Sequence, residues 1–159
     1  MNYKKEALKL AKKYDAKIKF HPKEKINEIY LTRQYDADDD LTGHIHCKQI
    51  KTAEDFAGIL HELAHWTYES EDFLDRINNK FDYSYVKNNI SKFTLKLEFN
   101  AWKHATYLYP NWTYDMKQEF LSSIKSYIRG WEYTWKRNLN KKFMGRITDL
   151  NKPPFKIYS

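Results

Sequence analysis

The segment ILHELAHW, residues 59–66, places two histidines and a glutamate in an otherwise apolar stretch. On a helix, His61 and His65 are offset by about 40° and one turn of rise, so that one zinc ion can bridge their imidazoles. Glu62 lies about 100° round from His61 and can reach a water in an open coordination position, where a general base belongs. We therefore predict a zinc site with Glu62 as the base. The alternative is a helix with two buried histidines whose hydrogen bonds are satisfied.

The third metal ligand must come from elsewhere, because catalytic zinc usually keeps three protein ligands and one open position. An extended motif, in which a third histidine ligand follows six residues after the second, is absent, because position 71 is glutamate. Glu98 lies on or beside the apolar stripe of segment 94–108, where a lone carboxylate is costly unless a cation pairs with it. We predict Glu98 as the third ligand; the alternative partner is an arginine or lysine at the helix edge. His104 is the rival ligand, but it lies about 240° round the same helix, so both cannot easily point to one metal.

Peptide hydrolysis also requires a hydrogen-bond donor for the tetrahedral oxyanion. His104 and Tyr107, in the turns that follow the predicted third ligand, are the nearest candidates in a chain with thirteen tyrosines. His44 and His46 share one face of a predicted strand, and we interpret them as strand residues near the cleft. That strand, 44–50, is also a candidate for the sheet edge along which an extended peptide pairs.

The flanking sequence predicts the elements that position these residues. Apolar residues recur at helical spacing in four segments and alternate with polar residues in three, which indicates an α+β domain. We expect one domain over residues 1–159, with a basic, irregular tail at 138–159. The predicted elements are a helix at 3–14, strands at 16–20, 28–35 and 44–50, a turn at 36–43 marked by Gly43, helices at 53–68 and 92–108, a short piece at 73–77, an unassigned stretch at 84–91, and a last long helix.

Several residues define the ends of the predicted helices. Thr52, with Asp55 three residues on, is close to a capping box for the helix that carries the histidines. Pro110 ends the next helix, and Asn111 or Thr113 begins the last one. The apolar stripe of the last helix runs through Met116, Phe120, Ile124, Tyr127, Ile128, Trp131 and Trp135.

Charge is distributed unevenly along the chain. The total is +7, and residues 1–25 and 136–159 each carry +6, which leaves −5 for residues 26–135. Basic ends can contact nucleic acid or a partner, or can simply keep the protein in solution. The single cysteine, Cys47, excludes an intramolecular disulfide and a cysteine-based zinc site. The sequence shows no signal peptide and no run of about 18 apolar residues, so we expect a cytoplasmic protein without a membrane segment.

Four short motifs resemble those of ImmA/IrrE-type metallopeptidases and of the zincin-like domain of ArdC-type antirestriction proteins. They are HELAHWT at 61–67, FLDR at 73–76, EFNA at 98–101 and YIRGW at 127–131. The resemblance implies a small zincin core that acts in bacteria, phages or mobile elements, where some members cut a regulator and others accompany DNA transfer. This chain shows no helix-turn-helix segment, and Lys-Leu precedes Glu98 where acidic residues are common.

The resemblance also implies roles for single residues. His61 and His65 would be zinc ligands, Glu62 the catalytic base and Glu98 the third ligand. In a SprT-like arrangement, His104 would be the third ligand. We accordingly expect a zinc-dependent endopeptidase that acts on a regulatory or defence protein. The alternative is a non-proteolytic binding protein on a zincin scaffold, which would dock nucleic acid or a protein partner through its basic ends.

Overall fold

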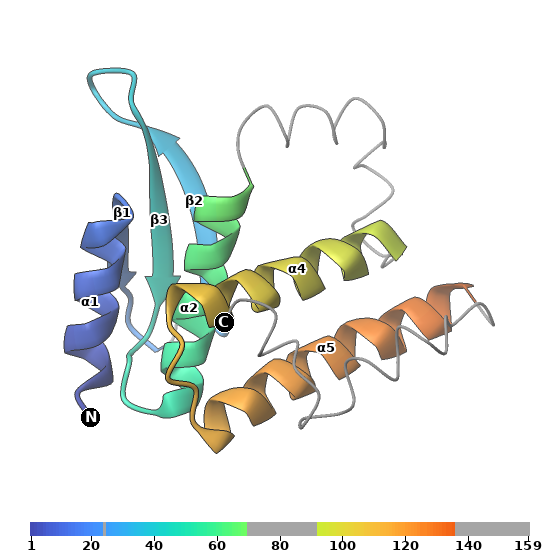
Figure 1. Ribbon diagram of the computed structural model, residues 1–159. Helices are drawn as coiled ribbons and strands as arrows, with labels where there is room; N and C mark the ends of the chain where they lie inside the picture. Colours follow the sequence, from blue (N-terminus) through green and yellow to red (C-terminus); the bar gives the residue numbers. More distant parts are fainter. Residues whose placement is uncertain (24, 70–91, 136–159) are drawn as a thin grey trace.

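The computed structural model describes residues 1–23, 25–69 and 92–135 of the chain. These residues form four helices and one three-stranded sheet, which confirms the α+β class (Figure 1). The predicted piece at 73–77, the stretch at 84–91 and the tail at 138–159 lie outside the described residues. The elements are α1 (Tyr3–Lys13), β1 (Ala16–Phe20), β2 (Tyr30–Tyr35), β3 (Leu41–Cys47), α2 (Ala53–Tyr68), α4 (Lys92–Leu108) and α5 (Tyr114–Trp135).

β3 is the middle strand of the sheet. β1 pairs with it in parallel on one side, and β2 pairs with it antiparallel on the other. The prediction that residues 44–50 form a sheet edge is therefore wrong, because β3 has a neighbour on each side. Its boundaries also differ from the prediction: β3 runs from Leu41 to Cys47, and β2 begins at Tyr30 and not at residue 28.

The turn between β2 and β3 is shorter than the predicted 36–43. The Asp36 carboxylate accepts hydrogen bonds from the backbone N–H groups of Asp38 at 2.9 Å and Asp40 at 3.0 Å. Asp39 adopts a φ of 60°, a left-handed conformation that aspartate tolerates better than most residues. Since these aspartates reverse the chain by residue 40, Gly43 is not needed in the turn.

Gly43 lies inside β3, against the indole of Trp66 from α2. A Cβ atom at position 43 would lie 2.5 Å from Cδ2 of Trp66, so only glycine fits this close approach. Nε1 of the same indole donates a hydrogen bond to the backbone oxygen of Tyr14 at 2.8 Å. One side chain of α2 therefore contacts both the central strand and the connection between α1 and β1.

The predicted helix ends are largely confirmed. Thr52 and Asp55 form a capping box at the start of α2, in which each side chain accepts a backbone N–H of the other residue. Thr113, and not Asn111, precedes α5, and its hydroxyl accepts the N–H three residues on at 3.3 Å. Pro110 follows the end of α4 as expected. A capping side chain is worth about 1 kcal/mol, and it fixes the residue at which a helix begins.

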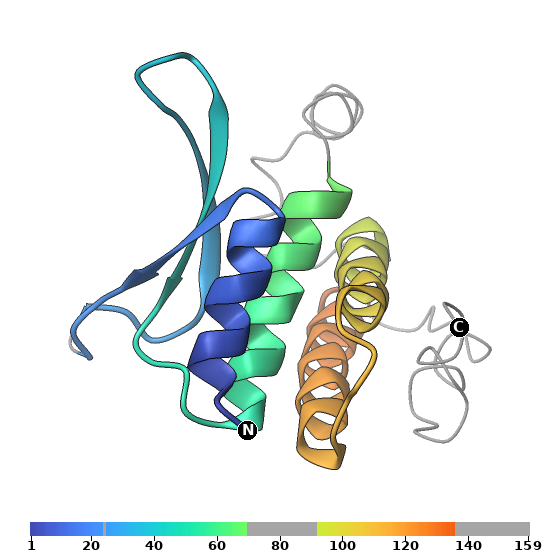
Figure 2. The ribbon, with the colours of Figure 1, turned by 60° about the vertical axis from the view of Figure 1, so that its left-hand side comes forward.

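The described residues form three layers, with α2 in the middle one (Figure 2). α1 and α2 lie side by side on one face of the sheet, and α4 and α5 pack on the side of α2 that faces away from the sheet (Figure 2). A helix enclosed in this way must be apolar around most of its circumference, as the sequence of α2 is.

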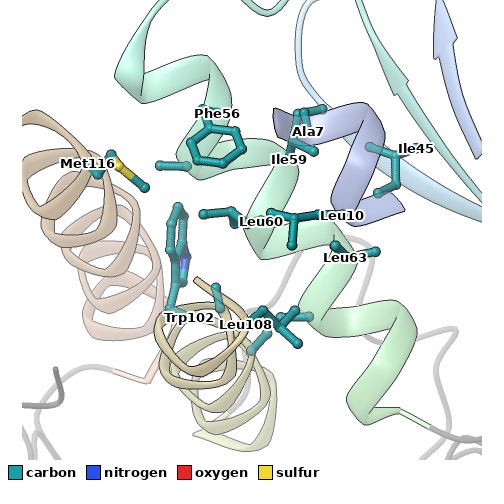
Figure 3. Packing of buried hydrophobic residues seen from close by; sticks show 14 of the residues in the cluster. Ala7, Leu10, Ile45, Phe56, Ile59, Leu60, Leu63, Trp102, Leu108 and Met116 are labelled. Atoms are coloured by element: carbon teal, nitrogen blue, oxygen red, sulfur yellow. The ribbon is translucent and has the colours of Figure 1, made fainter. Parts of the chain in front are cut away.

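Side chains from every layer meet around α2 (Figure 3). Full burial of an aliphatic or aromatic side chain stabilises a fold by about 1.5–3 kcal/mol, so this core holds α2 in place. The labelled side chains are Ala7, Leu10, Ile45, Phe56, Ile59, Leu60, Leu63, Trp102, Leu108 and Met116.

The predicted stripe of α5 is confirmed where its side chains are described. Met116, Phe120 and Ile124 are fully buried, and Tyr127 packs against the core. Within the described part of the chain, no helix has the length and apolar character to cross a membrane.

Candidate metal centre

α2 presents the two predicted histidine ligands one above the other. The Nε2 atoms of His61 and His65 lie 3.1 Å apart, and their rings meet edge to face at a centroid distance of 4.5 Å. His61 also stacks on Trp102 of α4, at a centroid distance of 4.3 Å and an angle of 21°. Both imidazoles thus direct Nε2 to one point, as the four-residue spacing predicts.

Glu98 completes the group from a second helix. One carboxylate oxygen, Oε2, lies 2.9 Å from Nε2 of His61, and the other, Oε1, lies 3.4 Å from Nε2 of His65. α4 packs directly against α2 and brings this carboxylate to the histidines. The three residues offer ligand atoms that all lie within 4.8 Å of one another. In the described residues this is the one such group of three or more His, Cys, Asp or Glu side chains.

The ligand atoms lie near enough to one another to share one metal ion. Zinc bonds of about 2.0–2.2 Å place neighbouring ligand atoms about 3.3 Å apart. Here one ligand atom from each residue lies within 4.8 Å of the others, and the two Nε2 atoms are 3.1 Å apart. Although Oε2 of Glu98 lies close to His61, no hydrogen bond of acceptable geometry reaches this buried oxygen from the described residues. A buried carboxylate oxygen without a donor is costly, and a cation would satisfy it. Two imidazoles and one carboxylate are a common donor set of catalytic zinc.

The side chains of the group shift one another's pKa values. Burial alone would lower the pKa of His65, but its contacts with Glu69 and Glu98 outweigh burial and raise the pKa to about 10. Burial alone would raise the pKa of Glu98, but the contacts with His61 and His65 lower it to about 2. The group therefore holds a positive charge on His65 next to an ionised Glu98 carboxylate.

Glu62 lies beside the group without belonging to it. Its Oε1 atom is 3.9 Å from Nε2 of His61, and its side chain is 15% exposed. Burial raises the pKa of Glu62, although the nearby His61 and His65 lower it in part. A carboxylate with a raised pKa accepts a proton more readily than one in water, which suits a general base.

The structure does not bring His104 and Tyr107 to this group. The ring of His104 lies beside those of Tyr68 and Tyr107, at centroid distances of 5.4 and 5.8 Å. Tyr107 is 58% exposed, and it lies nine residues from Glu98, on the opposite side of α4. The geometry gives no support to either residue as the oxyanion donor, nor to His104 as the third ligand.

His44 and His46 are strand residues, as predicted, but they face away from α2. Successive side chains of a strand point to opposite faces, and Ile45 belongs to the core beneath α2. His46 makes side-chain hydrogen bonds with His21 at 2.7 Å and Thr32 at 2.8 Å. The two histidines therefore lie on the other face of the sheet from the candidate metal centre.

Three residues around the centre were not predicted to contribute to it, and one of them, Tyr127, was predicted only as part of the apolar stripe and of the YIRGW motif. Glu69 accepts a hydrogen bond from Nδ1 of His65, and Arg33 contacts the Glu69 carboxylate. Tyr127 of α5 lies close enough to Glu98 and Glu62 that, after burial, their charges raise its pKa. The four-residue spacing of His65 and Glu69 was a usable signal, because residues at this spacing meet on a helix. Nothing in the local sequence indicated Arg33.

Comparisons with known proteins give no relative for this chain: no family model, no curated protein and no solved structure matches it.

Proposed function

We propose that this protein is a zinc-dependent endopeptidase. The observation that carries the proposal is the convergence of His61, His65 and Glu98 within 4.8 Å, with Glu62 beside them on the same helix. A metal site that serves only to stabilise a fold has no need of a general base next to its ligands. The position of Glu62 therefore favours hydrolysis over a structural role for the metal.

The proposed reaction assigns a task to each residue. His61, His65 and Glu98 would hold the zinc ion, which when bound supplies Lewis acidity that lowers the pKa of water toward about 7 and polarises a carbonyl group. Glu62 accepts a proton from the attacking water as its oxygen bonds to the carbonyl carbon. The same carboxyl group then gives that proton to the amine nitrogen as the C–N bond breaks.

The substrate we propose is a regulatory or defence protein in the cytoplasm of a bacterial cell, encoded by the host, a phage or a mobile element. The motif resemblance supports this class of substrate.

Two measurements test the proposal together. Elemental mass spectrometry of protein purified without added metal should find about one zinc per chain, and H61A should lose it. Incubation with proteome-derived peptides, followed by mass spectrometry of new termini, should show cleavage by the native protein. E62Q should keep its zinc but lose this cleavage. Absence of zinc in the native protein would overturn the proposal.

Retained zinc with no cleavage by the native protein would instead favour the non-proteolytic alternative. In that reading the basic ends dock nucleic acid or a partner, and neutralising them would weaken binding with a steep dependence on salt.

A further inference from the structure

Glu69 places a carboxylate where both burial and the end of a helix disfavour negative charge. Glu69 is only 7% exposed and caps the C-terminal end of α2, where the helix dipole repels negative charge. Burying a carboxylate is unfavourable unless it is paired with a cation or hydrogen-bond donors. The fold provides two partners for it, and each belongs to the surroundings of the metal centre.

The first partner is His65. Oε1 of Glu69 lies 2.5 Å from Nδ1 of His65, on the side of the ring away from the metal group. Since Nδ1 must then carry the hydrogen, the lone pair of a neutral His65 ring is at Nε2. Nε2 is the atom that faces Glu98 and His61. Metal-binding histidines are commonly held in this way by a carboxylate that fixes both the tautomer and the ring orientation.

The second partner is Arg33 of β2. Its Nη2 atom lies 3.4 Å from Oε2 of Glu69 and donates to the backbone oxygen of His65 at 3.1 Å. Arg33 thus contacts both members of the pair, the carboxylate of Glu69 and the backbone oxygen of His65. It connects them to β2, an outer strand of the described sheet. It also compensates the charge of Glu69 at the helix end.

His61 has no equivalent carboxylate among the described residues. Its Nδ1 atom is buried there without a hydrogen-bond partner, and the ring is held by stacking on Trp102. The two ligands on α2 are therefore held by different means, one by charge and one by an aromatic contact. This contrast makes the contribution of Glu69 separable by mutation.

We infer that Glu69 is the positioning residue of the metal centre and that Arg33 acts through it. This inference rests on the proposed function, because it requires zinc at His61, His65 and Glu98. Glu69 touches neither the metal nor the substrate in this scheme. It holds the His65 ring with Nε2 toward Glu98 and His61, and Arg33 holds the Glu69 carboxylate in place.

The test measures zinc affinity by competition with a chromophoric chelator, using the full chain. E69Q and E69A should weaken zinc binding about 10- to 100-fold, the usual range for loss of such a partner. R33M alone should weaken zinc binding less than E69A does. The double variant R33M/E69A should bind zinc about as weakly as E69A alone, because Arg33 acts through Glu69. E54Q, a change of an exposed glutamate on the same helix, is the matched control and should bind as the native protein does.

A second readout distinguishes positioning from general damage to the fold. Nitrogen NMR shifts of the zinc-loaded native protein should show His65 protonated at Nδ1, and E69Q should alter that signal while circular dichroism stays unchanged. Native zinc affinity in both E69Q and E69A would overturn the inference, as would equal effects of R33M in the native and E69A backgrounds. H61A separates the two proposals: if it also binds zinc normally, the proposed function fails, and if it alone loses zinc, only the role of Glu69 fails.

Discussion

Oε2 of Glu98 lies 2.9 Å from Nε2 of His61, although the two residues belong to different helices. The contact exists because α4 packs along α2, with Trp102 stacked on the His61 ring. One face of α4 therefore supplies both a candidate ligand and an aromatic wall. The metal centre depends on the packing of two helices as much as on the sequence of one.

Replacement of Glu98 by glutamine should remove the proposed third ligand with little change in side-chain volume. We expect E98Q to weaken zinc binding by more than about 100-fold, beyond the loss typical of a residue that only supports a ligand. Equilibrium dialysis with elemental analysis measures this. D38N, a change in the exposed turn between β2 and β3, is the control. Full occupancy of E98Q by zinc would exclude Glu98 as a ligand.

Zinc should stabilise the folded protein, because an unfolded chain does not bring His61, His65 and Glu98 together. At a free zinc concentration of 100 times Kd, the expected gain is about 2.7 kcal/mol. Thermal unfolding with and without a chelator should show a higher Tm for the zinc-loaded protein. H61A should show no difference between the two conditions. If the Tm of the native protein is the same with and without zinc, there is no zinc site at these residues.

The candidate metal centre was predictable from the sequence because its signals are local. His61 and His65 are linked by helix geometry alone, and Glu98 is conspicuous as a carboxylate beside an apolar stripe. The class of the fold follows from alternation and helical periodicity in the same way. By contrast, Arg33 reaches Glu69 only through the tertiary fold, and nothing near it in sequence indicates that contact.

The order of the strands was not predictable for a related reason. Alternation shows which face of a strand is buried, but it does not show which strands are neighbours. β3 is buried on both faces, with Ile45 toward α2 and His46 on the opposite face, which is typical of a central strand. Gly43 was misplaced because glycine more often indicates a turn than a close contact with an indole.

Glycine at position 43 should be required by the fold. In G43A the new Cβ would lie 2.5 Å from the Trp66 ring, so we expect a loss of about 1–3 kcal/mol in the free energy of unfolding. Urea denaturation measures this loss. G58A is the matched comparison. Its Cβ would meet the terminal Cδ1 atom of Ile29 at 2.8 Å, and alanine in a helix gains up to about 1 kcal/mol over glycine. Equal stability of G43A and the native protein would show that the indole moves away at no cost.

The thiol of Cys47 should be inert in the folded protein. Cys47 is fully buried on β3, and burial, with a smaller contribution from Asp55, raises the pKa of its thiol from 9.0 to about 11. A shift of this size lowers the thiolate fraction at pH 8 by about 100-fold, and only the thiolate reacts. Reaction with a disulfide reagent should therefore be slow in the native protein and should reach one thiol per chain in denaturant.

The same raised pKa sets the sign of a pH dependence. The folded state favours the protonated thiol, so its contribution to stability is complete below pH 9 and is lost as the pH rises through about 11. Unfolding free energies measured between pH 8 and 11 should fall more steeply for the native protein than for C47A, which lacks the thiol. Parallel curves for the two proteins, or rapid labelling of the native thiol at pH 8, would show that Cys47 is open to solvent.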